Sequence, residues 1–209
     1  WTPPGRGLWM MGTKFVNERT AAGLFNCAFR STRELNTKGG YLFSWMMDAL
    51  MLGIGVGFDT LGAGTLNVQQ PEFTNENHTI PDSREGWVDS VRILLNGFLF
   101  GAKVPNFDYS AIRPYGAPIN GFGGTSSGHG PLKELHESLI DLYTERIGQP
   151  ITSVDIVDTE NLIGRCVVAG NVRRSAALAL GNHEDREYLQ MKNDSEKLAH
   201  HRWSSNNSF

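Results

Sequence analysis

Residues 121–128 form a glycine-rich segment with the composition of a phosphate-binding loop. Its glycines and hydroxyl residues are Gly121, Gly123, Gly124, Thr125, Ser126, Ser127 and Gly128. Glycines let the backbone approach a ligand closely, and Pro131 is typical of a helix start, which would place free N–H groups nearby. No lysine follows the last glycine, so this is not a Walker A loop. A helix-capping turn has the same composition and stays open as the alternative.

Three arginines lie in segments that the sequence predicts to be loops. Arg173 and Arg174 follow Asn171 between an expected helix and an expected strand, and Arg113 precedes Pro114. A guanidinium group can bind phosphate through paired hydrogen bonds or stack on a base. A solvated surface arginine is the alternative interpretation of each.

The chain has two cysteines, too few for a disulfide framework or a zinc site. Cys27 lies beside Asn26 in an expected strand, where a thiol is either a small core group or a nucleophile. Cys166 lies on an apolar helix face and is expected to be buried. His200 and His201 have no further ligands at metal spacing, so we expect surface or packing roles for them.

Strands and helices must position these residues. Apolar and glycine-containing runs predict strands at 24–31, 55–58, 107–112 and 177–180. The expected helix starts are Ser44, Asp82 with Glu85 as a capping box, Pro131, and Asp158 or Thr159. The expected ends of the first, third and fourth helices are Gly53, Gly148 and Gly170. A charged helix is expected at 184–199 and an exposed polar excursion at 60–80.

Each predicted helix has an apolar face that we expect to be buried. The members are Trp45, Met46, Ala49, Leu50, Trp87, Val91, Leu94, Leu95, Phe98, Leu132, Leu135, Leu139, Leu142, Leu162, Ile163, Cys166 and Val167. Strands that alternate with helices at this spacing indicate an α/β fold with a largely parallel sheet.

The composition of the 209 residues is that of a globular protein, with 40% hydrophobic and 20% charged residues. A net charge of −3 argues against a basic nucleic-acid-binding surface. No run approaches the roughly 18 consecutive apolar residues of a membrane span, and the first residues lack the features of a secretion signal. A reducing, cytoplasmic setting is therefore the default expectation.

Neither end of the sequence resembles a natural terminus. Trp1 is not an initiator, and residues 204–209 include neither a helix cap nor a charged tail. We therefore expect residues 1–209 to be a single partial domain, cut from a longer protein at both ends.

Eight short motifs follow one another along the chain. They are Pro4-Gly5-Arg6-Gly7-Leu8-Trp9, Asn26-Cys27, Gly55-Val56-Gly57-Phe58, Asp82-Ser83-Arg84-Glu85-Gly86-Trp87, Ile112-Arg113-Pro114-Tyr115-Gly116-Ala117, Gly121-Phe122-Gly123-Gly124-Thr125, the stretch 168–176, and the stretch 200–208. In this order they resemble the adenosylcobalamin-dependent (class II) ribonucleotide reductases, most closely the monomeric ribonucleoside-triphosphate reductases. The resemblance implies a ten-stranded α/β barrel in two five-stranded halves, of which this chain would be the first half.

The resemblance also implies a reaction, the replacement of a ribonucleotide's 2′-OH by hydrogen for DNA synthesis. Adenosylcobalamin would generate a thiyl radical on a finger-loop cysteine, which takes the 3′-hydrogen. Two further cysteines would reduce the substrate and finish as a disulfide, and Cys27 occupies the position of one of them. A thioredoxin-like dithiol would then reduce that disulfide. The substrate would be a ribonucleoside triphosphate or diphosphate.

Binding roles follow from the same resemblance. Gly55 and Gly57 would lie where the strand passes the substrate sugar, with Asn26 contributing a backbone contact. Residues 121–128 and 170–176 would be two specificity loops, ordered by a deoxynucleotide effector so that they select the base. Their candidate residues are Gly123, Gly124, Thr125, Ser126, Asn171, Arg173 and Arg174, with Arg113 at the effector phosphate.

The sequence also departs from the family pattern. It contains no Asn-Pro-Cys-x-Glu motif for the radical cysteine and no second redox cysteine in the expected place, so we expect these 209 residues alone to be inactive. The excursion at 60–80, where monomeric relatives carry a long insertion, is short. Two alternatives stay open: a reductase with another radical source, and a non-catalytic split-gene half or nucleotide-binding regulatory module that needs a partner chain.

Overall fold

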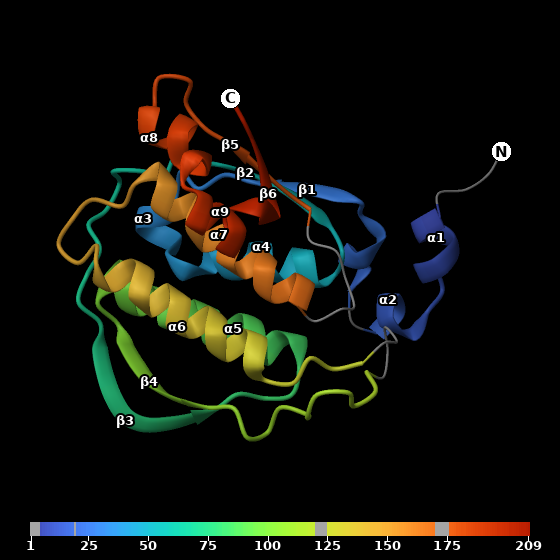
Figure 1. Cartoon of the computed structure of the whole chain (residues 1–209). Helices are drawn as coiled ribbons and strands as arrows, with labels where there is room; N and C mark the ends of the chain where they lie inside the picture. The colour runs from blue at the N-terminus through green and yellow to red at the C-terminus, as the bar shows by residue number, and fades with distance from the viewer. Residues whose placement is uncertain (1–4, 19, 120–124, 170–175) are drawn as a thin grey trace.

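The main sheet has four parallel strands in the order β1-β2-β5-β6. The computed structural model describes residues 5–18, 20–119, 125–169 and 176–209 (Figure 1). The strands are β1 (Cys27–Arg30), β2 (Gly55–Asp59), β5 (Ala177–Leu180) and β6 (Ser205–Ser208). The predicted α/β class with a parallel sheet is confirmed, and four strands of this sheet lie in the described residues.

Helical segments connect the strands, because parallel neighbours cannot be joined by a tight turn. Helix α4 (Gly40–Met51) joins β1 to β2, α7 (Ser153–Ala169) precedes β5, and α9 (Ser195–His200) precedes β6. Figure 1 shows α4, α7 and α9 on one side of the sheet. The helices therefore cover one sheet face.

A second helical layer lies beyond the first. It consists of α5 (Arg84–Phe100) and α6 (Gly130–Thr144), flanked by a parallel pair of strands, β3 (Glu72–Thr79) and β4 (Lys103–Asp108) (Figure 1). The short elements are α1 (Gly5–Met10), α2 (Lys14–Glu18), η1 (Ala21–Leu24), α3 (Leu35–Lys38), α8 (Arg186–Gln190), η2 (Met191–Asn193) and η3 (Arg202–Ser204). Within the described residues, no helix combines the length and the apolar character needed to cross a bilayer.

The core fills the space between the sheet and the two helical layers. Phe43 and Met46 of α4 and Phe58 of β2 are fully buried. Phe98 of α5 stacks on Tyr143 of α6, with ring centroids 5.6 Å apart. The apolar faces predicted for the helices are confirmed as part of this core, with three members only partly buried: Trp45, Trp87 and Leu142.

Three predicted helix starts are wrong. Helix α4 begins at Gly40, so Ser44 lies inside it. Helix α5 begins after Ser83 instead of Asp82, because the Ser83 hydroxyl accepts a hydrogen bond from the Gly86 N–H at 3.0 Å. The Ser83 side chain thereby satisfies one of the free N–H groups of the first turn.

Helix α7 begins at Ser153, five residues before the predicted Asp158. Its start is capped reciprocally: the Asp155 N–H donates to Thr152 Oγ1 at 3.1 Å, and the Thr152 N–H donates to Asp155 Oδ2 at 2.8 Å. The first turns of α7 are rich in buried polar residues, so apolar periodicity does not reveal them.

The remaining corrections concern strands and the C-terminal helices. Strand β4 covers 103–108 instead of 107–112, and the excursion at 60–80 is largely exposed as predicted but contains β3. The single helix expected at 184–199 is three short ones, because Asp194 caps α9 by accepting the Lys197 N–H at 3.0 Å. Helix α6 ends at Thr144, before Gly148, and β1 begins at Cys27, after a 3-10 turn.

Candidate active site

The two faces of the main sheet have opposite characters. Val56 and Phe58 of β2 are buried against the helices. On the other side, Cys27 is exposed, Phe29 is 54% exposed and Leu178 is 40% exposed. We call this second side the open face; it consists of Cys27, Phe29, Gly55, Gly57, Ala176, Leu178 and Asn206. Side chains on it are available to a ligand.

Cys27 lies at the start of β1, in register with Gly55 at the start of β2. Its thiol is free and exposed. The Gly55 N–H donates to the Asn26 carbonyl at 2.9 Å, and the next N–H of β2 donates to the Ala176 carbonyl at 2.8 Å. A Cβ built on Gly55 would have no neighbour nearer than 3.6 Å. The structure therefore brings Cys27 and Asn26 together beside Gly55, which carries no side chain and leaves room for a methyl-sized group among the described residues.

Gly57 occupies a different environment from Gly55. It is in register with Phe29 on one side and with Leu178 on the other, and Asn206 follows on β6. A Cβ built on Gly57 would lie 3.1 Å from Phe29 Cδ2. The space above Gly57 is therefore taken by the Phe29 ring.

Arg6 holds the segments that lead into β1 and β2. Its guanidinium donates to the carbonyls of Gly23 at 3.1 Å, Leu52 at 3.3 Å and Gly53 at 2.5 Å. Gly23 precedes β1, whereas Leu52 and Gly53 precede β2. Arg6 thus fixes the spacing of the strand starts that carry Cys27 and Gly55. The sequence identifies the motif that contains Arg6, but the role of its side chain is visible only in the fold.

Arg113, the expected effector-phosphate ligand, is half-exposed and already paired. Its Nε lies 2.8 Å from Asp82 Oδ2, and its Nη1 donates to the Pro118 carbonyl at 2.9 Å. Thr125 forms an isolated bridge with Pro118. The structure therefore brings Arg113 and Thr125 into one loop cluster.

Ser126 closes the same loop. Its N–H donates to the Ala117 carbonyl, and its carbonyl accepts the Gly116 N–H, both at 2.8 Å. Its hydroxyl accepts the Gly128 N–H at 3.0 Å, and Gly128 has a φ of +69°, which favours glycine. The other expected loop residues lie outside the described part of the chain: Gly123, Gly124, Asn171, Arg173 and Arg174.

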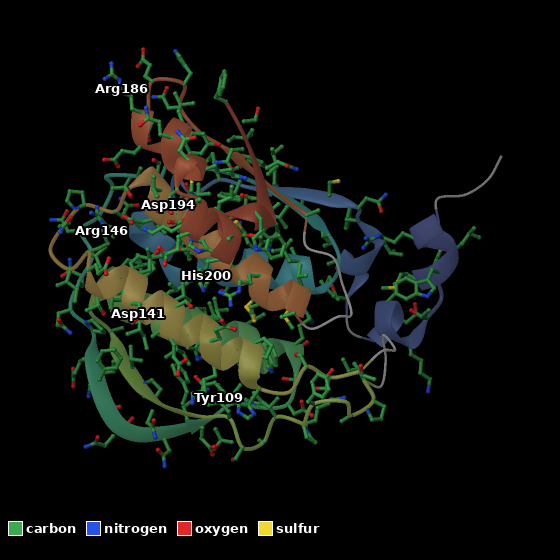
Figure 2. The ribbon with its side chains drawn as sticks, in the orientation of Figure 1. Tyr109, Asp141, Arg146, Arg186, Asp194 and His200 are labelled. Atoms are coloured by element: carbon green, nitrogen blue, oxygen red, sulfur yellow. The ribbon has the colours of Figure 1, made fainter. Side chains whose placement is uncertain are left out.

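A buried hydrogen-bond chain anchors the start of this loop region. Tyr109, which follows β4 (Figure 2), has its hydroxyl 2.7 Å from His136 Nδ1. His136 Nε2 lies 3.1 Å from Ser90 Oγ, and Ser90 Oγ donates to the Trp87 carbonyl at 2.8 Å. Ser90 therefore accepts from Nε2–H, and Tyr109 donates to Nδ1. Burial lowers the pKa of His136 to about 3.

Asp158 is the centre of a second buried cluster. Its carboxylate accepts hydrogen bonds from Arg202 Nε at 2.7 Å and Nη2 at 2.6 Å, and His201 Nε2 lies 3.0 Å away. Burial alone would raise the pKa of Asp158, but Arg202 and His201 lower it below its ordinary value. The pairs connect α7 to η3, which leads into β6.

His201 is buried, so the packing role expected for it is confirmed. Among the described residues, no group of acidic, His or Cys side chains is arranged to hold a metal.

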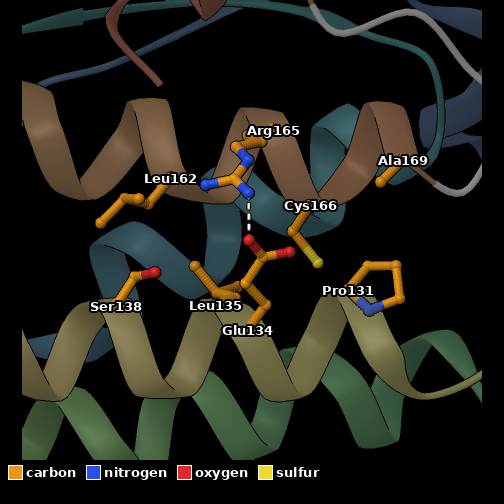
Figure 3. A pocket seen from close by; sticks show the side chains of 8 residues that line it. All are labelled: Pro131, Glu134, Leu135, Ser138, Leu162, Arg165, Cys166 and Ala169. Atoms are coloured by element: carbon orange, nitrogen blue, oxygen red, sulfur yellow. Dashed lines mark hydrogen bonds and ion pairs between the residues drawn. The ribbon is translucent and has the colours of Figure 1, made fainter. Parts of the chain in front are cut away.

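Cys166 lies on the covered side of the molecule. It lines a small pocket between α6 and α7, beside the ion pair of Glu134 with Arg165 (Figure 3). Burial raises the pKa of its thiol to about 12, so the thiol is inert at neutral pH. The prediction that Cys166 is a buried core residue is confirmed.

Comparisons with known proteins agree with the motif order. Residues 59–143 match the family described as "B12-dependent ribonucleotide reductase, insertion domain". The probable adenosylcobalamin-dependent ribonucleoside-triphosphate reductase of Dictyostelium discoideum is 44% identical, and the adenosylcobalamin-dependent ribonucleoside-triphosphate reductase of Euglena gracilis is 46% identical. Each aligns with 99% of this chain. A crystal structure of a B-12 dependent (class II) ribonucleotide reductase superposes with a TM-score of 0.79, at 33% identity over 99% of this chain.

The chain is similar to the B12-dependent ribonucleotide reductases. It spans about a third of the length of these relatives: 30% of the Dictyostelium protein, 29% of the Euglena protein and 36% of the crystallised chain. The insertion-domain match begins at Asp59, at the end of β2, and so covers the excursion that the sequence predicts there.

The relatives are named as adenosylcobalamin-dependent, and a corrin ring is far larger than the pocket that Cys166 lines. The pocket between α6 and α7 has a cavity volume of about 20 Å³, which is room for about one water molecule. A corrin ring does not fit there.

Proposed function

We propose that this chain forms the Cys27 side of the active site in a complete reductase that converts ribonucleoside triphosphates to 2′-deoxyribonucleotides. The observation that carries the proposal is the exposed thiol of Cys27 in register with Gly55, where no side chain covers the sheet. A sugar lying on this part of the sheet would have its hydroxyl groups within reach of the thiol. The neighbouring Asn26 supplies backbone groups at the same level.

The proposed role of Cys27 is to donate a proton and electrons. Its thiol protonates the departing 2′-hydroxyl, which leaves as water. Cys27 and a second cysteine then supply two electrons and become a disulfide, while hydrogen replaces the hydroxyl on the sugar. Adenosylcobalamin would supply the radical that starts this reaction. Cys166 is not the second cysteine, because its thiol is buried between α6 and α7; that cysteine and a thioredoxin-like reductant come from elsewhere.

We assign the effector site to the two loops. Arg113, Thr125 and Ser126 would act with Gly123, Gly124, Asn171, Arg173 and Arg174 on a deoxynucleotide. The loop cluster that brings Arg113 and Thr125 together at Pro118 supports this role, and an effector phosphate would compete with the Asp82 carboxylate for the guanidinium.

The direct test is Cys27→Ser in the complete reductase. The serine hydroxyl cannot form a disulfide, so we expect deoxynucleotide formation with a dithiol to fall at least about a hundredfold while nucleotide binding persists. Cys166→Ser is the matched control and should retain most of the activity. Full activity of Cys27→Ser would refute the proposal. The 209 residues alone should show no turnover under the same conditions.

A further inference from the structure

The two glycines of β2 have different neighbours on the open face. Above Gly55, the nearest atoms to an added Cβ are the Ala176 and Asn26 carbonyl oxygens at 3.6 Å, so a methyl-sized space is free among the described residues. Above Gly57, the Phe29 ring is already at 3.1 Å. One glycine therefore leaves room for a ligand, and the other leaves room for a side chain of the protein.

The strand register places the two glycines at different levels of the open face, each with its own neighbours. Cys27, Gly55 and Ala176 lie at one level of the sheet, and all three side chains are small or absent. Two residues along the strands, Phe29 and Leu178 lie on either side of Gly57. We call the level of Cys27, Gly55 and Ala176 the shelf, and it ends in the Cys27 thiol. We call the level of Phe29 and Leu178 the apolar wall, and it lies beside the shelf.

The ring of Phe29 is exposed enough to offer a contact surface to a bound molecule. It is 54% exposed on a sheet face where Leu178 is 40% exposed. The ring nevertheless has a defined place, because it lies against the backbone of Gly57. An aromatic ring held in this way offers a flat apolar surface to a sugar or base resting on the shelf.

We propose that Phe29 is a substrate-binding residue, and that Gly57 is glycine in order to seat its ring. The ring forms the wall that holds the nucleotide's sugar over Gly55 and against the Cys27 thiol. This inference rests on the proposed function and adds to it: Gly57 acts through Phe29, whereas Gly55 faces the substrate directly.

The test measures how fast the Cys27 thiol is alkylated in the complete reductase. Alkylation of Cys27 by iodoacetamide is measured by mass spectrometry of its peptide, with and without saturating CTP. We expect CTP to slow alkylation at least tenfold in the unaltered enzyme and less than twofold in Phe29→Ala, with a KM for CTP raised about tenfold. Phe29→Leu should recover part of the protection because it restores apolar bulk.

Phe73→Ala is the matched control. Phe73 is also 54% exposed, but it lies on β3, away from the open face. Its removal should leave CTP protection and KM unchanged. Melting temperatures of all variants show whether each one is folded.

A double-mutant cycle tests the second half of the proposal. Gly57→Ala should reduce CTP protection when Phe29 is present, because the new methyl group would lie 3.1 Å from Phe29 Cδ2 and the ring must shift. In the Phe29→Ala background the same change should have little further effect. Equal losses in both backgrounds, or full protection in folded Phe29→Ala, would overturn the inference. An absence of CTP protection in the unaltered enzyme would instead refute the proposed function.

Discussion

The imidazole of His136 is held in one protonation state by its neighbours. Tyr109 donates to Nδ1, and Ser90, whose own hydrogen goes to the Trp87 carbonyl, accepts from Nε2–H. A second proton on the ring would make Nδ1 a donor, so the Tyr109 hydroxyl would have to give up its donation and accept instead. This agrees with a pKa lowered by burial to about 3.

The first prediction concerns the pH dependence contributed by His136. The unfolded chain binds this proton near pH 6.5, and the folded ring only near pH 3. Between these values the unfolded state holds more protons, so the free energy of unfolding should fall by about 1.4 kcal/mol for each pH unit below 6.5. Melting temperatures of the complete protein from pH 4 to 7 should show this slope, and His136→Gln should reduce it. His183→Gln, at an exposed site, should keep it; an unchanged slope in His136→Gln would contradict the assignment.

Glu160 on α7 produces the opposite dependence. It is fully buried, and among the described residues no hydrogen-bond partner reaches either carboxylate oxygen. Burial raises its pKa well above 4.5, so the folded carboxyl stays protonated while the unfolded one ionises. Stability is therefore lost as the pH rises above 4.5.

The second prediction follows from this burial. Glu160→Gln keeps the shape of the side chain and removes the ionisation, so it should raise the melting temperature at pH 7 and leave it nearly unchanged at pH 4. Glu137→Gln on the exposed face of α6 is the control. A gain of equal size at both pH values would show that the carboxyl is not the cause.

At the scale of elements, apolar spacing predicts α5, α6 and β5 well, because their buried positions are occupied by apolar residues. It fails for the start of α7. Asp155, Asp158 and Glu160 are buried there, although their charged side chains predict exposed positions. The partners that make their burial possible lie far along the chain, as with Arg202 for Asp158. In the site, Cys27 and Gly55 can be predicted from the motifs, whereas the pairing of Phe29 with Gly57 depends on strand register and is visible only in the fold.

The third prediction concerns the connection between α7 and η3. Asp158→Ala would leave Arg202 buried without its carboxylate, and loss of one partner of a buried pair typically costs about 3–5 kcal/mol. We expect a large fall in melting temperature and faster proteolysis around β6. Glu34→Ala breaks an exposed pair with Lys38 and should have little effect. Similar losses in the two variants would argue against a special role for the buried cluster.

At the scale of the whole molecule, the covered and open faces of the sheet set the solution behaviour. The open face presents Phe29 and Leu178 to solvent, and β1 and β6 are the outer strands of the described sheet. Exposed apolar surface and free strand edges promote association.

The fourth prediction is therefore that the isolated 209 residues self-associate. Sedimentation velocity should show species larger than a monomer, growing with concentration. Phe29→Ser together with Leu178→Ser should reduce the association by removing the apolar surface. A monomer that melts in one sharp transition would contradict this expectation.

The strands occur in the sheet in the same order as in the chain, β1-β2-β5-β6. During synthesis on the ribosome, each newly emerged strand can dock on the free edge left by the one before it, and none has to be inserted between two strands already paired. The nascent chain can therefore grow its sheet from one side, one strand and one helix at a time. Each intermediate has one edge to which the next strand can be added. Contact with the folded part then guides that strand into place, and the sheet widens as translation proceeds.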